Sequence, residues 1–212
     1  LEVAFTNTPF LQENGFTEET ILALFIPNTY EFYWNTPANK IANKLAKEYN
    51  KFWNEDRLAK AKAKNLTPIQ VYTLASIVHK ETAKVDERPD VAGVYLNRLR
   101  QDMPLQADPT IIYAIKLRSG DFDQEIKRVF YNDLRIKSPY NTYINKGLPP
   151  GPIAMPDVSA IDAVLNATNH DYIYFCANPD KPGYHAFASS YEAHQVNAKK
   201  YAEWVTKLGI DR

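Results

Sequence analysis

The sequence has little cysteine and no long apolar run. Cys176 is the single cysteine among 212 residues, so neither an intramolecular disulfide nor a zinc site made of several cysteines can form. The longest apolar run, Ile21 to Ile26, is far too short to cross a bilayer, and no signal-peptide pattern opens the chain. Because the sequence begins at Leu1 without a methionine, we expect it to be a fragment, and an anchor missing here says nothing about the full-length protein.

An excess of charge of one sign is also missing. The 25 basic and 25 acidic side chains cancel, so no broad electrostatic field draws the chain to nucleic acid or to an anionic membrane surface. We therefore expect no nucleic-acid partner. With 45% hydrophobic residues, a chain of this length can bury a sizeable core in one large domain or two small ones. The 14 tyrosines, 10 phenylalanines and 3 tryptophans suit sugar faces, although core packing is their default role.

Residues 1–35 are expected to be a small N-terminal segment or the remnant of a preceding domain, with residues 36–212 as the main domain. In the first part, a short helical pattern over 17–24 precedes a cluster of aromatic side chains: Tyr30, Phe32, Tyr33 and Trp34. Two Thr-Pro pairs then predict helix starts, because threonine caps helices and proline suits the first helical position. We expect helices over 36–64, continuous or in two parts, over 67–82, and after Pro89.

The sequence changes character from Asp102 onward. Turn-forming pairs with proline recur up to Pro156, and this region should be mostly loop of the kind that builds a groove. Residues 157–169 predict a helix, residues 171–177 a strand with a hairpin partner at 185–187, and residues 190–208 a last helix. The pattern indicates an α+β fold: a helix-rich body with a small β-sheet and groove-forming, proline-rich loops.

One carboxylate lies in an unusual position. Glu81 falls within the apolar stripe of its predicted helix, beside Ile77, whereas His79 and Lys80 point roughly 130° away, toward solvent or a polar neighbour. Removal from water disfavours an ionised carboxylate, so the pKa of Glu81 should rise and the group could give up a proton near neutral pH. A general acid for glycosidic cleavage needs this property. The spacing alone favours a structural role over this one: Glu81 would reach water at a frayed helix end or pair with a buried arginine such as Arg98.

Several motifs accompany this helix in a fixed order. They are Leu74–Thr82 (LASIVHKET), Val91–Leu99 (VAGVYLNRL), Pro104–Thr110 (PLQADPT), Tyr140–Tyr143 (YNTY), Gly147–Ile153 (GLPPGPI) and His185–Phe187 (HAF). In this order, the sequence resembles the YceG-like family of endolytic murein transglycosylases, often called MltG. Several motifs in order are far more specific than any one of them.

The resemblance implies a bacterial peptidoglycan lytic transglycosylase, a lyase that works without a cofactor. Residues 36–212 would be its catalytic domain, on the periplasmic side of the inner membrane, held by a single N-terminal span outside this sequence. Glu81 would be the catalytic residue that cleaves the bond between N-acetylmuramic acid (MurNAc) and N-acetylglucosamine (GlcNAc) in glycan strands. Peptidoglycan glycan strands are the implied partner, together with cell-wall synthesis enzymes on the strength of the family alone.

A lytic transglycosylase is expected to need a single carboxyl group. Ordinary glycosidases use two, one as acid and one as nucleophile or base. Here the nucleophile is the sugar's own C6 hydroxyl. Glu81 would protonate the leaving oxygen and then accept the C6 hydroxyl proton, which leaves a 1,6-anhydro-MurNAc end.

Further residues are candidate substrate contacts, from their chemistry and from the family. The amides of Asn97 and Gln106 suit N-acetyl and hydroxyl groups, and Asn141 with Tyr140 and Tyr143 could form a polar and aromatic rim. For Asn97 and Asn141, a helix-surface or turn role is about as well supported.

Three more residues have alternatives of their own. Asp108 precedes Pro109, and capping of the next helix is favoured over catalysis. Arg98 could hold a carboxylate or a peptide stem, or could pair on the surface. His185 is expected to pack at a strand end.

The sequence departs from the family pattern at two places. His79 stands where the family often has glutamate, which puts any role of that position in doubt. Met155-Pro156-Asp157 stands where the family often has Asn-Pro-Gly, in a loop expected beside the groove.

Two functions of other classes compete with this interpretation. One is a catalytically silent glycan-binding or scaffold module, in which the aromatic N-terminal segment contacts partners. The other is a muramidase-like hydrolase, which needs a second carboxylate about 5 to 9.5 Å from the first. Asp86, Glu87 and Asp108 are the candidates, and one of them across the groove from Glu81 would favour hydrolysis.

We predict that no metal takes part, because His170 and His194 have no ligand partners at metal spacing. A chelator should leave glycan cleavage by this chain unchanged. Loss of cleavage in the chelator, with recovery on adding zinc, would contradict the prediction.

Overall fold

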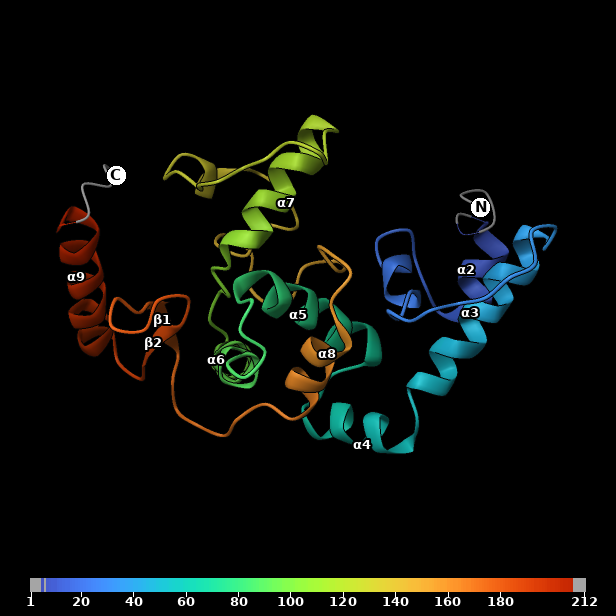
Figure 1. Cartoon of the computed structure of the whole chain (residues 1–212), viewed down its shortest axis with the longest axis horizontal. Helices are drawn as coiled ribbons and strands as arrows, with labels where there is room; N and C mark the ends of the chain where they lie inside the picture. The colour runs from blue at the N-terminus through green and yellow to red at the C-terminus, as the bar shows by residue number, and fades with distance from the viewer. Residues whose placement is uncertain (1–4, 6, 208–212) are drawn as a thin grey trace.

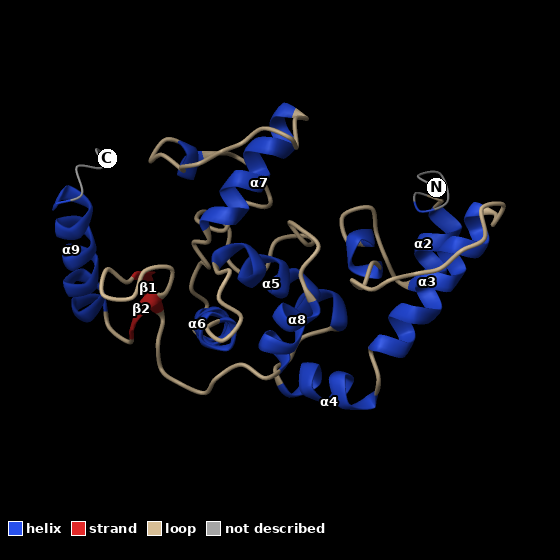
Figure 2. Ribbon diagram, in the orientation of Figure 1, coloured by secondary structure: helices blue, strands red, loops and turns tan. Residues whose placement is uncertain are grey.

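The computed structural model describes Phe5 and residues 7–207 and has an α+β fold, as the sequence predicts (Figures 1 and 2). Helices dominate, and the two strands form one antiparallel hairpin. The elements in chain order are α2 (Thr8–Asn14), η1 (Ile21–Leu24), α3 (Ala38–Phe52), α4 (Glu55–Ala63), α5 (Pro68–Glu81), α6 (Arg88–Arg100), α7 (Asp108–Ser119), η2 (Asp133–Arg135), α8 (Val158–Leu165), β1 (Tyr174–Ala177), β2 (His185–Ala188) and α9 (Tyr191–Lys207).

Helix α5 is the centre of the molecule. Its start follows from the sequence: the Thr67 hydroxyl accepts from the backbone N–H of Gln70, and the Gln70 side chain accepts from the N–H of Thr67. Every residue from Val71 to Val78 is buried, because α6, α7 and α8 pack around this helix. A helix buried on all sides supports the site at its C-terminal end with little freedom to move.

The N-terminal elements pack against the same core. Leu24 of η1 is buried in a cluster that also contains Leu45 of α3 and Leu74 of α5. The Tyr72 hydroxyl donates to the carbonyl of Phe25 at 2.8 Å. By contrast, Tyr33 and Trp34 of the aromatic cluster are fully open to solvent. Figure 1 shows these elements at one end of an elongated molecule, with α9 at the other.

The proline-rich region is largely loop, as predicted, but helix α7 interrupts it. Figure 1 shows α7 and the chain after it rising above the central helices. The loop that returns from it is pinned by Asn141, which is fully buried. The Asn141 amide donates to the carbonyls of Leu134 and Ile136 at 3.0 and 2.9 Å, and its Oδ1 accepts from the N–H of Tyr143 at 2.8 Å.

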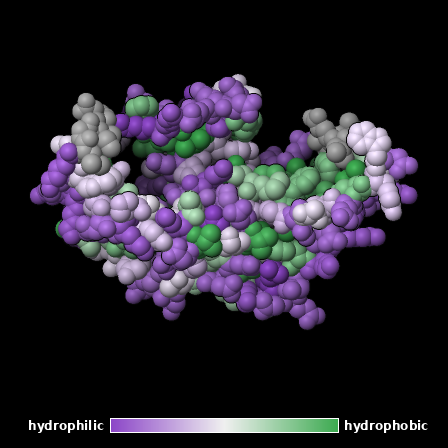
Figure 3. Space-filling model, in the orientation of Figure 1, coloured by the Kyte–Doolittle hydropathy of each residue, from purple (hydrophilic) through white to green (hydrophobic). Residues whose placement is uncertain are grey.

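The hairpin lies beside α6 at the C-terminal end of the fold. Strand β1 pairs antiparallel with β2, with Phe175 opposite Phe187. Two α6 side chains hold the segment that leads into β1: Asn97 donates to the carbonyls of His170 and Tyr172, both at 2.8 Å, and Arg98 donates to that of Ile173 at 2.7 Å. Figure 3 shows a hollow between the segment around α7 and α9.

Several predicted boundaries were wrong. The helix predicted from Thr36 begins at Ala38 after Pro37. Of the two alternatives for residues 36–64, two helices are confirmed: the chain breaks at Trp53 and Asn54 into α3 and α4, because Asn54 caps α4. The helical pattern over 17–24 is a single 3₁₀ turn at its second half, and α2 was not predicted. The helix predicted over 157–169 ends at Leu165. Leu208, at the end of the predicted last helix, lies outside the described residues.

No helix among the described residues is both long and apolar enough to cross a membrane.

We predict that Asn141→Ala lowers the free energy of unfolding by about 2–4 kcal/mol, because two buried carbonyls would lose their donor. Chemical denaturation measures this loss. The control is Asn166→Ala, an exposed asparagine whose amide also donates to a backbone carbonyl, and it should cost less than about 0.5 kcal/mol. Unchanged stability with weakened glycan binding would instead mark Asn141 as a substrate contact.

Candidate active site

Glu81 is the last residue of α5 and lies at the bottom of a small pocket. Its carboxylate Oε1 accepts a hydrogen bond of 2.6 Å from the hydroxyl of Tyr95, which is a fully buried residue of α6. The residue is half-buried, with protein on most sides and the pocket on the remaining one. None of the ion pairs between described residues involves Glu81. Glu81 therefore neither frays into open water nor pairs directly with Arg98.

The surroundings of Glu81 favour its protonated form. Burial raises the pKa of Glu81 from its ordinary value of 4.5 to about 7. The Tyr95 hydrogen bond works in the opposite direction, the negative charge of Asp108 raises the pKa further, and the positive charge of Arg98 lowers it. A carboxyl group that titrates near neutral pH can give a proton and take it back in one reaction cycle.

The pocket has a volume of about 180 Å³ and is built by three helices, β1 and two loop segments. Its lining residues are Glu81, Tyr95, Arg98, Leu105, Gln106, Asp108, Tyr143 and Phe175. Of the sequence-predicted residues, the structure brings Glu81, Gln106 and Tyr143 together here. The volume suits part of one sugar ring, so a longer ligand would have to continue along the surface.

Gln106 reaches the pocket from a strained backbone. Its φ of +52° lies in the left-handed region of backbone conformations, which residues other than glycine rarely adopt. The backbone N–H of Gln106 donates to the carbonyl of Thr142 at 3.0 Å, and its Oε1 accepts from Arg98 at 3.3 Å. The Arg98 guanidinium also donates to the carbonyls of Pro104 and Leu105. Arg98 is thus a buried anchor for the 104–106 loop, and burial lowers its pKa.

Asp108 is in the pocket, and its predicted capping role was wrong. The N-cap of α7 is Ala107, and no side chain caps this helix. The Asp108 carboxylate instead accepts a hydrogen bond of 2.6 Å from the Tyr143 hydroxyl. Burial, followed by the hydrogen bond to Asp108, raises the pKa of Tyr143.

The remaining candidate substrate contacts lie outside this pocket. Asn141 and Asn97 use their amides on backbone carbonyls, as described above, and both are buried. The ring of Tyr140 is buried against that of Tyr113, with centroids 4.7 Å apart. The sequence could not separate these residues from pocket residues, because an amide suits a sugar and a backbone carbonyl equally well.

Comparison with known proteins places the chain in a family. The sequence profile of the YceG-like family matches residues 3–200. The chain belongs to the YceG-like family.

Two curated relatives carry the same name. The endolytic murein transglycosylase of Bacillus subtilis (strain 168) is 35% identical over 176 residues, which is 82% of this chain and 46% of the relative. That of Streptococcus pneumoniae serotype 2 (strain D39 / NCTC 7466) is 41% identical over 142 residues, which is 66% of this chain and 25% of the relative. The chain thus spans less than half the length of these relatives.

A solved structure has the same fold. The crystal structure of a protein described as YceG-like, from Listeria monocytogenes, superimposes with a TM-score of 0.73 and 28% sequence identity. The match covers 92% of this chain and 64% of the Listeria chain.

The two departures from the YceG-like pattern contact each other. His79 and Asp157 lie 3.3 Å apart through Nδ1 and Oδ2. Arg88, which is buried, donates to Asp157 at 3.2 Å and lies 3.3 Å from the same His79 nitrogen. The carboxylate of Asp157 therefore pairs with Arg88 beside His79. Neither residue lines the Glu81 pocket, and His79 has the polar neighbours that its helical position predicts.

The other acidic and histidine candidates lie elsewhere. Glu87 is buried and accepts from Nδ1 and the backbone N–H of His185 at 2.8 and 2.6 Å, which ties the start of α6 to β2. Asp86 accepts from the Tyr184 hydroxyl. No group of three or more potential metal ligands occurs within the described part of the chain.

Three pocket residues, Tyr95, Leu105 and Phe175, were not predicted from the sequence. Tyr95 is adjacent to Glu81 only because α6 packs against the end of α5, and Phe175 reaches the pocket from β1 and packs against Tyr95 with ring centroids 5.8 Å apart. The sequence did contain a signal for Tyr95. It lies three residues before the candidate residue Arg98, and residues at this spacing share one face of a helix.

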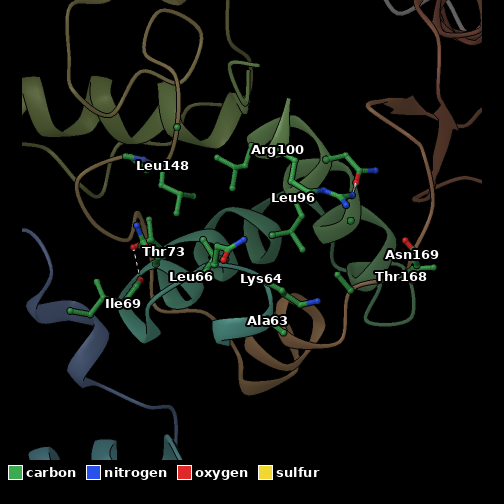
Figure 4. Close-up of a pocket in the computed structure, with 18 of the residues that line it drawn as sticks. Ala63, Lys64, Leu66, Ile69, Thr73, Leu96, Arg100, Leu148, Thr168 and Asn169 are labelled. Atoms are coloured by element: carbon green, nitrogen blue, oxygen red, sulfur yellow. Dashed lines mark hydrogen bonds between the residues drawn. The ribbon is translucent and has the colours of Figure 1, made fainter. Parts of the chain in front are cut away.

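A larger cavity of about 810 Å³ lies on the opposite face of α6 (Figure 4). Ile69 and Thr73 of α5, Leu96 and Arg100 of α6, and Leu148 line it. No acidic residue is among its lining residues, so it lacks the proton donor that glycosidic cleavage needs.

We predict that Glu81→Gln stabilises the protein in a pH-dependent way. Since the folded-state pKa of about 7 exceeds the ordinary 4.5, the wild type loses stability as pH rises through this range, by on the order of 3 kcal/mol. The variant has no such loss, so its advantage in unfolding free energy should be larger at pH 8 than at pH 5.

Chemical denaturation at the two pH values tests this difference. The matched control is Glu192→Gln on the exposed face of α9, which should change stability by less than about 0.5 kcal/mol. An equal advantage of Glu81→Gln at both pH values would contradict the raised pKa.

Proposed function

We propose that this chain is the catalytic part of an endolytic lytic transglycosylase. It cleaves the β-1,4 bond between MurNAc and GlcNAc in peptidoglycan glycan strands and leaves 1,6-anhydro-MurNAc ends. The observation that carries the proposal is the Glu81 carboxyl, which opens into a pocket and has a pKa near 7. The names of the two bacterial relatives agree with this activity.

Glu81 would be the sole acid and base. In its protonated form it gives its proton to the glycosidic oxygen as the bond to the anomeric carbon breaks. The C6 hydroxyl of the same MurNAc then attacks that carbon, and the Glu81 carboxylate takes the hydroxyl proton. The Tyr95 hydroxyl donates to the carboxylate between these steps and holds it in place. No water enters the product, and the step uses no metal or cofactor.

Gln106 and Tyr143 are the substrate contacts that the pocket geometry supports. Both line the pocket beside Glu81, and the Gln106 amide has donor capacity left for an acetamido carbonyl. Asn97, Tyr140 and Asn141 would act indirectly, because they hold the segments that carry the pocket residues.

Peptidoglycan as substrate implies an extracytoplasmic site of action. We propose the periplasmic face of the inner membrane, with a membrane anchor outside this sequence and with cell-wall synthesis enzymes as partners.

A muramidase-like hydrolase is the second candidate, and one observation favours it. Asp108 lines the same pocket as Glu81, and a hydrolase requires two carboxylates. The two activities differ in their products: hydrolysis leaves reducing ends, whereas a transglycosylase leaves 1,6-anhydro ends. A silent glycan-binding module, the third possibility, cuts nothing.

We predict that purified glycan strands incubated with this chain acquire internal 1,6-anhydro-MurNAc ends, measured by mass spectrometry. Glu81→Gln should lower the rate by at least about 100-fold because the proton donor is lost. Glu192→Gln serves as the control and should cleave like the wild type.

The other outcomes separate the alternatives. Reducing ends would identify a hydrolase. Strands that bind but stay intact with both proteins would identify the silent module.

A further inference from the structure

The pocket contains two carboxylates in opposite environments. Glu81 ends helix α5 and is half-buried, whereas Asp108 is the first residue of helix α7 and is exposed. Each accepts one 2.6 Å hydrogen bond from a tyrosine: Glu81 from Tyr95, and Asp108 from Tyr143. Two carboxyl groups in one pocket that differ in their exposure to water can perform different tasks in one reaction.

Asp108 carries a negative charge that no cation neutralises directly. None of the ion pairs between described residues involves Asp108. Arg98 lines the same pocket, but its guanidinium donates to three backbone carbonyls and to Gln106. The uncompensated charge is therefore available to a ligand in the pocket.

The chain holds Asp108 in one orientation. The 141–143 segment is bonded to the start of α7: Thr142 accepts from the N–H groups of Gln106 and Ala107, both at 3.0 Å. Asn141 in turn accepts from the N–H of Tyr143 at 2.8 Å. The donor on Asp108 thus follows directly on residues that are hydrogen-bonded to the start of α7 and to the preceding loop, which is a form of the preorganisation that electrostatic catalysis requires.

Building on the proposed function, we propose that Asp108 is a second catalytic carboxylate, which stabilises the positive charge that develops at the anomeric carbon of MurNAc, and that Tyr143 is its positioning residue. Glycoside cleavage passes through an oxocarbenium-like state, and a fixed negative charge beside it lowers the barrier.

The electron and proton balance leaves Asp108 unchanged. The Glu81 proton goes to the glycosidic oxygen, which leaves with the electron pair of the bond to the anomeric carbon. The C6 oxygen forms the new bond to that carbon, and its proton returns to Glu81. Asp108 forms no bond, since the hydrogen bond from Tyr143 occupies a lone pair of its carboxylate and opposes a role as nucleophile.

The test compares kcat, KM and products on purified glycan strands for the wild type, Asp108→Asn, Tyr143→Phe and the double variant. Asp108→Asn should lower kcat by about 100- to 1,000-fold with little change in KM, and its residual product should still end in 1,6-anhydro-MurNAc. Tyr143→Phe should have a smaller effect, about 10-fold, and the double variant should resemble Asp108→Asn. Asp56→Asn, in the first turn of α4, is the matched control and should leave kcat unchanged.

The pH profile separates this role from a structural one. The charged and titratable groups facing Glu81 are Tyr95 and Arg98 of α6, Asp108 of α7, and Tyr143. Because the charge of Asp108 raises the pKa of Glu81, Asp108→Asn should move the basic limb of the profile to lower pH, and a purely structural loss would not. Thermal unfolding checks that the exposed substitution leaves the fold intact.

Each contrary outcome has a distinct meaning. If the wild type leaves 1,6-anhydro ends and Asp108→Asn is within about threefold of it, the role of Asp108 is overturned and the proposed function stands. If the wild type leaves reducing ends, the proposed function itself fails.

Discussion

The site depends on the hydrogen bond between the Tyr95 hydroxyl and the Glu81 carboxylate. The bond exists because α6 packs against the C-terminal end of α5, so that a fully buried tyrosine meets the last residue of the neighbouring helix. Burial raises the pKa of the carboxyl, and the hydrogen bond from the tyrosine lowers it. Together with the charges of Asp108 and Arg98, these two effects give a pKa of about 7, which suits a residue acting as both acid and base.

Most buried polar side chains near the site hydrogen-bond to the backbone of the loops. Arg98 donates to carbonyls on both sides of the pocket, at Ile173 before β1 and at Leu105 in the 104–106 loop. Asn141 does the same for the loop that carries Tyr143. Long loops bury backbone groups that no helix or sheet satisfies, and side chains must pair with them. These side chains hold the loops in place, and the loops in turn hold the pocket residues in place.

His79 and Asp157 meet at one buried arginine, although they are far apart in the sequence. Arg88 is buried and needs a carboxylate, which Asp157 provides from the turn before α8. An unpaired buried arginine would be strongly destabilising. The sequence analysis put a role of position 79 in doubt and placed residue 157 in a loop beside the groove, and the structure joins the two positions through Arg88.

The sequence by itself determined the helix-rich α+β fold, the capped start of α5, the hairpin, and the position of Glu81 on an apolar helix face, because each of these follows from local capping, turn and periodicity rules. Only the tertiary structure decided that Asp108 faces the pocket, that Tyr95 bonds Glu81, and that Asn97, Tyr140 and Asn141 are anchors. The physical reason is that an amide, a carboxylate or a phenol accepts many partners, and long-range packing selects which one it meets.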